Sequence, residues 1–189
     1  MNRFWIVFLC FVMLMGSSVS GEEEAAQLLI DFRAPDTDVE WRVVDDGVMG
    51  GLSKGNHKHH SDHLQFYGTL SLENNGGFSS IRMYEKLDLG GCKGVRLRVR
   101  GDGRTYQVRF QADARLTNNR WVSFRSEFAT EAGVWIDVDV PFDSLKQSFH
   151  GRELSGYDFD PKKIQMLGFL LADKNPGAFD LSVQWVKTY

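Results

Sequence analysis

Apolar and polar side chains alternate along much of this 189-residue chain, and this alternation restricts its fold more than any other feature. Between 95 and 100, valine or leucine at the odd positions alternates with arginine at the even positions. A period of two puts the two sets of side chains on opposite faces of an extended strand. The same period predicts strands at 106–111, 121–128, 136–140 and 179–185.

Shorter apolar runs predict further strands, and the connections between them narrow the architecture. The run at 164–171 is apolar almost throughout, so we expect its strand to be covered on both faces. Segments 74–77 and 101–103 supply Asn, Asp and Gly, which tolerate the positive φ of tight turns. The other runs that predict strands are 28–32, 41–44, 64–72 and 78–83.

Helical periodicity is not sustained in any stretch of the sequence. One short helical turn is expected within 142–149, where Pro141 is suited to start it. About ten short strands separated by turns, without internal repeats or a long linker, are typical of sandwiches and jelly rolls. The sequence therefore predicts an all-β protein, with a single antiparallel β-sandwich or jelly-roll domain over 29–189.

The N-terminus has the pattern of a secretory signal peptide. Arg3 is the only charge before Glu22, and an apolar run from Phe4 to Met15 is followed by small residues. This run is shorter than the ~20 residues that span a bilayer, although an uncleaved anchor is an alternative. We predict a signal peptide over 1–20, a short leader over 21–28, a secreted or periplasmic location, and no stable membrane insertion after cleavage.

Composition and missing motifs exclude several functional classes. The 22 Lys and Arg against 25 Asp and Glu give a net charge of −3, so no basic field indicates a nucleic-acid partner. Cys92 is the one cysteine beyond the predicted signal peptide, and we interpret it as a small apolar residue rather than a nucleophile. No nucleophile elbow, zinc-protease motif, phosphate loop or dinucleotide motif is present, so we expect no enzyme and no cofactor.

The loop at 45–53 joins paired carboxylates to glycines. Asp45 and Asp46 could bind a structural Ca²⁺, which prefers six to eight oxygen ligands, or could act in acid–base chemistry together with Glu73. The alternative is that both carboxylates accept backbone N–H groups and only shape the turn.

Four histidines lie within seven residues, which makes a second candidate site. Clustered imidazoles can bind Zn²⁺, Cu²⁺ or Ni²⁺. We interpret the segment as a solvated loop with incidental metal affinity, since Asn56, Ser61 and Asp62 interrupt it. The weak metal candidates are His57, His59, His60 and His63.

Polar side chains on the alternating strands form a third candidate site. If these strands are neighbours, their polar residues share one sheet face, with Trp121 able to stack on a sugar or to join a protein interface. The alternative is a solvated face with Arg–Asp pairs across the strands. The candidate binding residues on this face are Arg98, Gln107, Arg109, Trp121 and Arg125.

The segments at 41–53, 66–82, 101–106, 135–142 and 164–179, in this order and spacing, resemble the complex I intermediate-associated protein 30 family. The resemblance covers roughly Leu29 to Val186. It implies a galactose-binding-like jelly roll that assists assembly of respiratory complex I by binding, without accepted catalysis or cofactor. The motif residues that carry over as binding candidates are Asp45, Asp46, Ser53, Glu73, Asn74, Asn75, Phe78 and Arg82, beside Gly50, Gly51, Gly76 and Gly77.

Three functional hypotheses follow. The first is an exported, non-catalytic binding module that holds a protein partner in an assembly or chaperone-like role. The second is a carbohydrate-binding module that uses the polar sheet face. The third is an enzyme that uses Asp45, Asp46 or Glu73 as acid or base.

Overall fold

The computed structural model describes residues 27–34, 39–116, 118 and 120–189. The predicted signal peptide over 1–20 and the leader up to residue 26 lie outside the described residues. Within the described part of the chain, no helix combines the length and the apolar character needed to cross a membrane.

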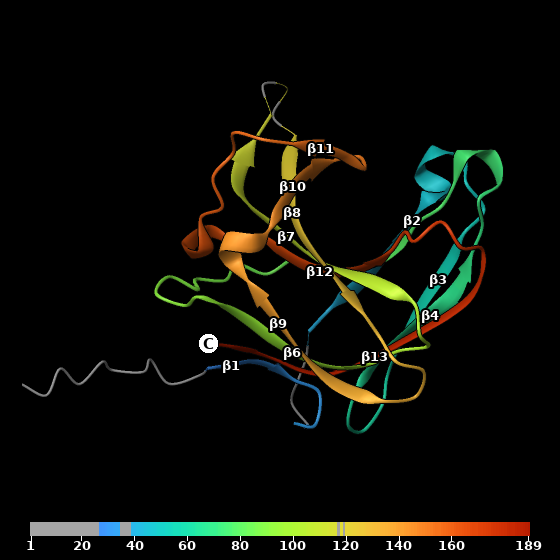
Figure 1. The fold of residues 1–189 in the computed structure, drawn as a ribbon, viewed down its shortest axis with the longest axis horizontal. Coiled ribbons are helices and arrows are strands. Elements are labelled where there is room, and N and C mark those ends of the chain that lie inside the picture. Colours follow the sequence, from blue (N-terminus) through green and yellow to red (C-terminus); the bar gives the residue numbers. More distant parts are fainter. Residues whose placement is uncertain (1–26, 35–38, 117, 119) are drawn as a thin grey trace, which may run out of the picture.

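Two antiparallel sheets pack against each other (Figure 1). The first sheet, sheet A, has the strand order β3 (Lys54–His59), β4 (Leu64–Leu70), β13 (Gly177–Thr188), β6 (Gly94–Arg100) and β9 (Trp135–Pro141). A sixth strand, β1 (Leu28–Asp31), pairs with β13, which occupies a central position.

The second sheet, sheet B, contains seven strands in the order β11 (Arg152–Leu154), β10 (Lys146–Phe149), β8 (Trp121–Ala129), β7 (Thr105–Arg115), β12 (Met166–Leu171), β5 (Ser79–Met83) and β2 (Trp41–Asp45). Its strands β7 and β8 form the longest hairpin of the fold. Short 3₁₀ turns occur at η1 (Asp46–Met49), η2 (Glu73–Asn75), η3 (Phe142–Ser144) and η4 (Pro161–Lys163).

The inward faces of the two sheets form the core. Phe66 and Leu97 of sheet A and Phe110 and Phe169 of sheet B are fully buried, as a period of two requires. All six residues of β12 are buried, which confirms the prediction that this strand is covered on both faces. The predicted all-β sandwich of the jelly-roll type is confirmed.

Each of the ten predicted strands is present, and the expected helical turn is η3. Asn74, Asn75 and Gly77 have positive φ, as their turn predicts. The strands that the sequence pattern did not indicate are β3, β10 and β11. These strands lie at or next to a sheet edge, where little apolar surface needs to be covered, so their sequences lack a clear alternation.

Candidate functional site

Asp46 is the centre of a buried hydrogen-bond cluster between the β2–β3 and β4–β5 connections. Its Oδ1 accepts the backbone N–H of Ser53 at 3.0 Å. Its Oδ2 accepts the hydroxyl of Ser53 at 2.5 Å and the backbone N–H groups of Gly77 and Phe78 at 2.6 and 3.2 Å. Burial alone would raise the pKa of Asp46, but these four hydrogen bonds outweigh it and hold the pKa below its ordinary value.

Asp45 has a similar role at the end of β2. Its Oδ2 accepts the backbone N–H of Gly55 at 2.9 Å, and its Oδ1 accepts the hydroxyl of Ser79 at 2.6 Å. Glycine is needed beside Asp46, because a Cβ on Gly51 would lie 2.4 Å from Oδ1 of this residue and a Cβ on Gly76 would lie 2.6 Å from its Oδ2. Asp46 therefore connects neighbouring loops, and Asp45 connects the end of β2 with β3 and β5, which agrees with the alternative that both carboxylates shape the turn.

The other residues of the motif loops are placed apart from this cluster. Glu73, Asn74 and Asn75 form η2 and are exposed. Glu73 lines an open groove of about 520 Å³ together with Leu72 and Pro176. The structure thus brings together Asp45, Asp46, Ser53 and Phe78, and it leaves the η2 residues outside.

The histidines do not form the loop expected from the sequence. His57 and His59 lie in β3, and only His60 and His63 are in the turn before β4. The four rings make two pairs, with centroids 6.0 Å apart for His57 and His59 and 4.4 Å apart for His60 and His63. Among the described residues, no three His, Cys, Asp or Glu side chains are grouped to hold a metal ion.

The predicted polar face is divided between the two sheets. The expectation that Arg98 and Arg109 lie on one sheet face is therefore wrong. Arg98 lies on β6 in sheet A, where it pairs with Asp137 of β9 at 2.8 Å. Gln107, Arg109, Trp121 and Arg125 lie on β7 and β8 in sheet B. Alternation fixes which side chains share a face of one strand, but it does not determine which sheet that strand joins.

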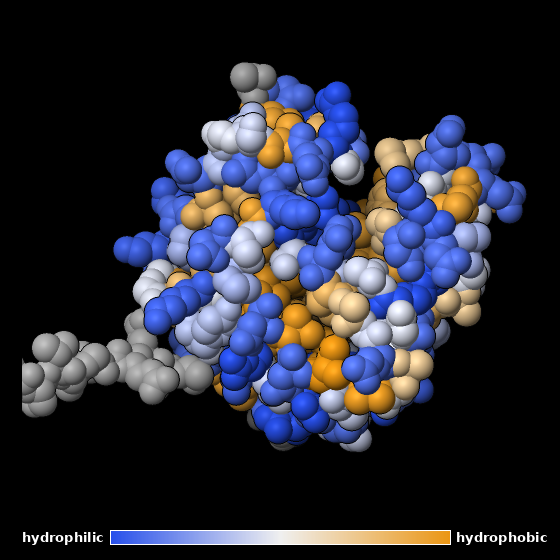
Figure 2. Space-filling model, in the orientation of Figure 1, coloured by the Kyte–Doolittle hydropathy of each residue, from blue (hydrophilic) through white to orange (hydrophobic). Residues whose placement is uncertain are grey.

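Arginines gather on the outer face of sheet B. In the register, Gly168 of β12 pairs with Arg82 of β5 on one side and with Arg109 of β7 on the other, and Arg109 pairs with Arg125 of β8. The molecule is hollowed between the part that carries β10 and β11 and the part that carries η1 and η2 (Figure 2). Arg82, from the motif loops, and Arg109, from the predicted sheet face, thus belong to one site.

Arg109 is the most unusual side chain of this face. Among the residues that the structure describes, its buried Nε has no hydrogen-bond partner, and its one hydrogen bond runs from Nη2 to the hydroxyl of Ser148 at 3.3 Å. Burial, with the nearby charges of Arg82 and Arg125, lowers the pKa of Arg109 to about 10. The side chain is therefore a cation at pH 7 in a place that disfavours charge.

The remaining residues of the face are already engaged. Arg125 pairs with Glu127 at 2.5 Å and Glu153 at 3.3 Å, and the same carboxylate of Glu127 accepts the amide of Gln107 at 3.2 Å. The guanidinium of Arg115 lies 3.5 Å from the ring centroid of Trp121. A cation–π contact thus covers one face of the tryptophan that we had considered as a sugar platform.

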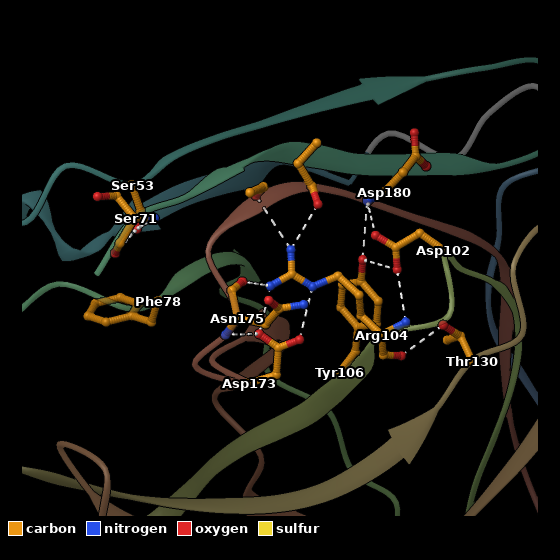
Figure 3. Close-up of polar contacts among 12 residues, drawn as sticks. Ser53, Ser71, Phe78, Asp102, Arg104, Tyr106, Thr130, Asp173, Asn175 and Asp180 are labelled. Carbon is orange, nitrogen blue, oxygen red and sulfur yellow. Dashed lines mark hydrogen bonds and ion pairs between the residues drawn. The ribbon is translucent and has the colours of Figure 1, made fainter. Parts of the chain in front are cut away.

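A second polar cluster was missed by the sequence reasoning. Arg104, just before β7, donates from Nε and Nη2 to both oxygens of Asp173 at 2.9 and 2.7 Å (Figure 3). It also donates to the backbone carbonyls of Asn175, Gly177 and Ala178. The Gly-Asp-Gly-Arg turn at 101–104 was a signal for it, but the carbonyl acceptors have no side-chain signature.

Asp102 extends this cluster into the core. It accepts the hydroxyl of fully buried Tyr106 at 3.0 Å and the backbone N–H of Asp180 at 2.9 Å (Figure 3). Burial, followed by the charge of Asp102, raises the pKa of Tyr106 well above its ordinary range. The cluster connects β7 with the start of β13, and we assign it a role in stabilising the fold.

Several solved structures with a similar fold are carbohydrate-binding modules. A family 11 module of the cellulase Lic26A-Cel5E of Clostridium thermocellum matches 86% of this chain and 93% of its own, with a TM-score of 0.65 and 15% identity. The family 11 module in complex with a β-1,3-1,4-mixed-linked tetrasaccharide has a TM-score of 0.64, 14% identity, and coverage of 86% and 94%. A family 30 module has a TM-score of 0.55 and 12% identity over 88% of each chain. At this identity the likeness shows the galactose-binding-like fold alone.

A curated relative from Mus musculus corrects the expected location. The mitochondrial complex I intermediate-associated protein 30 is 27% identical over 192 aligned positions, which cover 88% of this chain and 57% of the relative. Because this relative is mitochondrial, it contradicts the prediction of a secreted or periplasmic location. An apolar N-terminal run does not by itself determine the compartment to which a protein is sent.

The sequence model of one protein family spans most of the fold. It matches residues 30–183, from β1 into β13, and so includes both sheets, the Asp46 cluster and the Arg82–Arg109 site. This match agrees with the resemblance found in the motifs. The chain belongs to the complex I intermediate-associated protein 30 family.

Proposed function

We propose that the chain is a non-catalytic protein-binding module that associates with an intermediate of complex I assembly through the outer face of sheet B. Family membership and the named mouse relative support this role. The chain spans about 57% of the length of that relative, so the proposal concerns the part that the two share.

The observation that carries the proposal is the pair Arg82 and Arg109. Within the described part of the chain, neither side chain has a carboxylate within ion-pair distance, although both lie on a recessed face. Arginine is enriched at the centres of protein interfaces, where its fork of donors recognises acceptors of a partner. A cation without a counter-ion among the described residues favours an acceptor supplied by a partner.

The carboxylates support a role without catalysis. Asp46 is fully buried, and both of its oxygens accept hydrogen bonds from the loops. Both oxygens of Asp45 accept hydrogen bonds from β3 and β5. A general acid or base must be within reach of a substrate proton. Of the three candidates, only Glu73 faces a groove.

Affinity isolation tests the proposal. The tagged full chain is produced in cells that assemble complex I, and complex I subunits are quantified by mass spectrometry against a tag-only control. We expect enrichment of several subunits with the wild type and at least a fivefold loss with the double variant R82Q/R109Q. Subunit recovery no higher than in the control would contradict the proposal.

Carbohydrate binding is the second candidate, because the fold resembles that of a family 11 carbohydrate-binding module in complex with a tetrasaccharide. Titration calorimetry with the mixed-linked β-1,3-1,4 tetrasaccharide tests it directly. Saturable binding that is lost in Trp121→Ala would favour this candidate. Heat no greater than dilution at millimolar sugar would remove it.

A further inference from the structure

Basic side chains form a row across six neighbouring strands of sheet B. The paired positions run from Arg42 to Arg82, Gly168, Arg109 and Arg125, and end at Lys146 of β10. We call these five basic residues, with Gly168 among them, the cationic row. Because neighbouring strands lie about 4.8 Å apart, the row extends over roughly 24 Å.

Arg42, at one end of the row, and Arg125, next to the other end, have ion-pair partners, whereas the central arginines have none among the described residues. Arg42 pairs with Glu40 at 3.0 Å, and Arg125 pairs with two glutamates. Arg82 has one neutral acceptor, the hydroxyl of Ser80, at 3.2 Å. Among the described residues, Arg109 has only the hydroxyl of Ser148 as an acceptor, and its buried Nε–H is unused. Lys146 also has no carboxylate within ion-pair distance among these residues, but it is exposed to water, whereas Arg82 and Arg109 are half-buried. The half-buried positive charge without a counter-ion therefore lies between β5 and β7.

Gly168 leaves space at this centre. It separates the two arginines in the register, and a Cβ at this position would lie 2.6 Å from the carbonyl oxygen of Ile81 and 3.3 Å from Cγ of Arg82. A cavity of about 30 Å³ opens here, lined by both guanidinium-bearing residues and by polar side chains on either side. Its polar lining consists of Ser80, Arg82, Arg109, Gln111 and Ser123.

We propose that this cavity, the Arg82–Arg109 pocket, binds one carboxylate of an extended acidic peptide segment in the protein partner. The inference rests on the proposed function and names the chemistry of the partner at that surface. A planar carboxylate can accept two N–H groups from one guanidinium, which suits the fork of arginine. It would give Arg109 both a counter-ion and an acceptor for Nε. Further acidic residues of the segment lie along the cationic row.

The lining favours a carboxylate over a sugar ring. Its one aromatic residue, Phe169, is fully buried in the core and presents no face for stacking. The volume of about 30 Å³ suits a single small polar group. The nearest candidate platform on the same strands, Trp121, already stacks with Arg115.

Peptide binding tests the pocket. A fluorescein-labelled peptide of eight glutamates is titrated with the full chain by anisotropy at 50 and 200 mM NaCl, with an eight-glutamine peptide as the uncharged probe. We expect saturable binding of the glutamate peptide only, weaker at the higher salt. Arg109→Gln is expected to weaken binding at least tenfold.

The matched control is Arg98→Gln, which removes an arginine from the middle of a strand on the opposite outer face. We expect its affinity to stay within twofold of the wild type. Thermal unfolding of each variant establishes that it is folded, and Arg82→Gln gives a second loss of binding independent of Arg109. Equal losses in Arg98→Gln and Arg109→Gln, or no loss in Arg109→Gln and Arg82→Gln, overturn the pocket.

Two further outcomes separate the possibilities. The peptide is ruled out as the occupant if an oligogalacturonate binds more than tenfold tighter than the peptide and if Arg109→Gln abolishes this tighter binding. In the affinity isolation, wild-type recovery of complex I subunits with undiminished recovery by Arg109→Gln overturns the pocket and leaves the proposed function standing. No recovery by the wild type contradicts the proposed function, while the peptide titration still decides the pocket.

Discussion

Two arginines five positions apart in the chain have opposite environments. Arg104, just before β7, uses all five of its N–H donors on acceptors of its own chain: two on Asp173 and three on backbone carbonyls. Arg109, within β7, has one acceptor among the described residues, the hydroxyl of Ser148 at 3.3 Å. The hydrogen bonds that Arg104 donates to Asp173 raise the pKa of Arg104, whereas burial lowers the pKa of Arg109.

The difference separates a structural arginine from a binding one. A buried cation with all its donors satisfied stabilises the fold, and its loss leaves a buried carboxylate without a partner. A buried cation with unused donors lowers stability, and a fold keeps it at a surface where a ligand can supply the missing acceptor. Each substitution below either strengthens this contrast or breaks it.

Arg104→Ala has the largest expected effect. It leaves Asp173 without its cationic partner, although the backbone N–H of Asn175 still donates to this carboxylate, and it removes the donor to three backbone carbonyls. We therefore expect the free energy of unfolding to fall by about 3–5 kcal/mol. Urea unfolding followed by tryptophan fluorescence measures it. If Arg104→Ala lowered the free energy of unfolding by less than Arg109→Ala does, the contrast between the two arginines would be wrong.

Asp46→Asn is expected to cost about 2 kcal/mol at pH 7, because an amide replaces a charged acceptor of four hydrogen bonds. The pKa of Asp46 is lower in the folded protein than its ordinary value. Its stabilising contribution is therefore complete above pH ~4 and is lost as the pH falls through the lower folded pKa.

The stability gap between the wild type and Asp46→Asn should consequently narrow below pH ~4. Urea unfolding at pH 7, 5, 4 and 3 measures this gap. A gap that stays constant over this range would mean that the charge of Asp46 contributes nothing and that only the loop packing matters.

Arg109→Met should change stability in the other direction. Methionine keeps the length of the side chain and removes a buried charge without a counter-ion, so we expect a gain of about 1 kcal/mol. The same variant should lose binding of the glutamate peptide. A loss of stability comparable to that of Arg104→Ala would show that Arg109 is structural after all.

The sequence was sufficient for the fold but only for parts of the site. Periodicity identified the strands that form the core, including β12, because burial of one or both faces leaves a direct pattern. It missed β3, which is polar and lies at an edge. The pairing of Arg82 with Arg109 across Gly168 could not be predicted, because it depends on the register of strands far apart in the chain.

The motif residues illustrate the same limit. Asp45 and Asp46 attracted functional interpretations because carboxylates beside glycines can bind metals or move protons. Their partners are mostly backbone N–H groups of other loops, and no residue type marks such groups in a sequence. Arg104 was overlooked for the same reason, since three of its five acceptors are backbone carbonyls.

Arg98→Gln has the smallest expected effect and calibrates the others. Arg98 pairs with Asp137 across β6 and β9, but the two side chains are 35% and 45% exposed, so water and salt screen their attraction. We expect a change in the free energy of unfolding of no more than ~0.5 kcal/mol. A loss of 2 kcal/mol or more in urea unfolding would mean that exposed pairs on sheet A carry real stability. An ion pair of an arginine would then stabilise this fold without the burial and the five satisfied donors of Arg104.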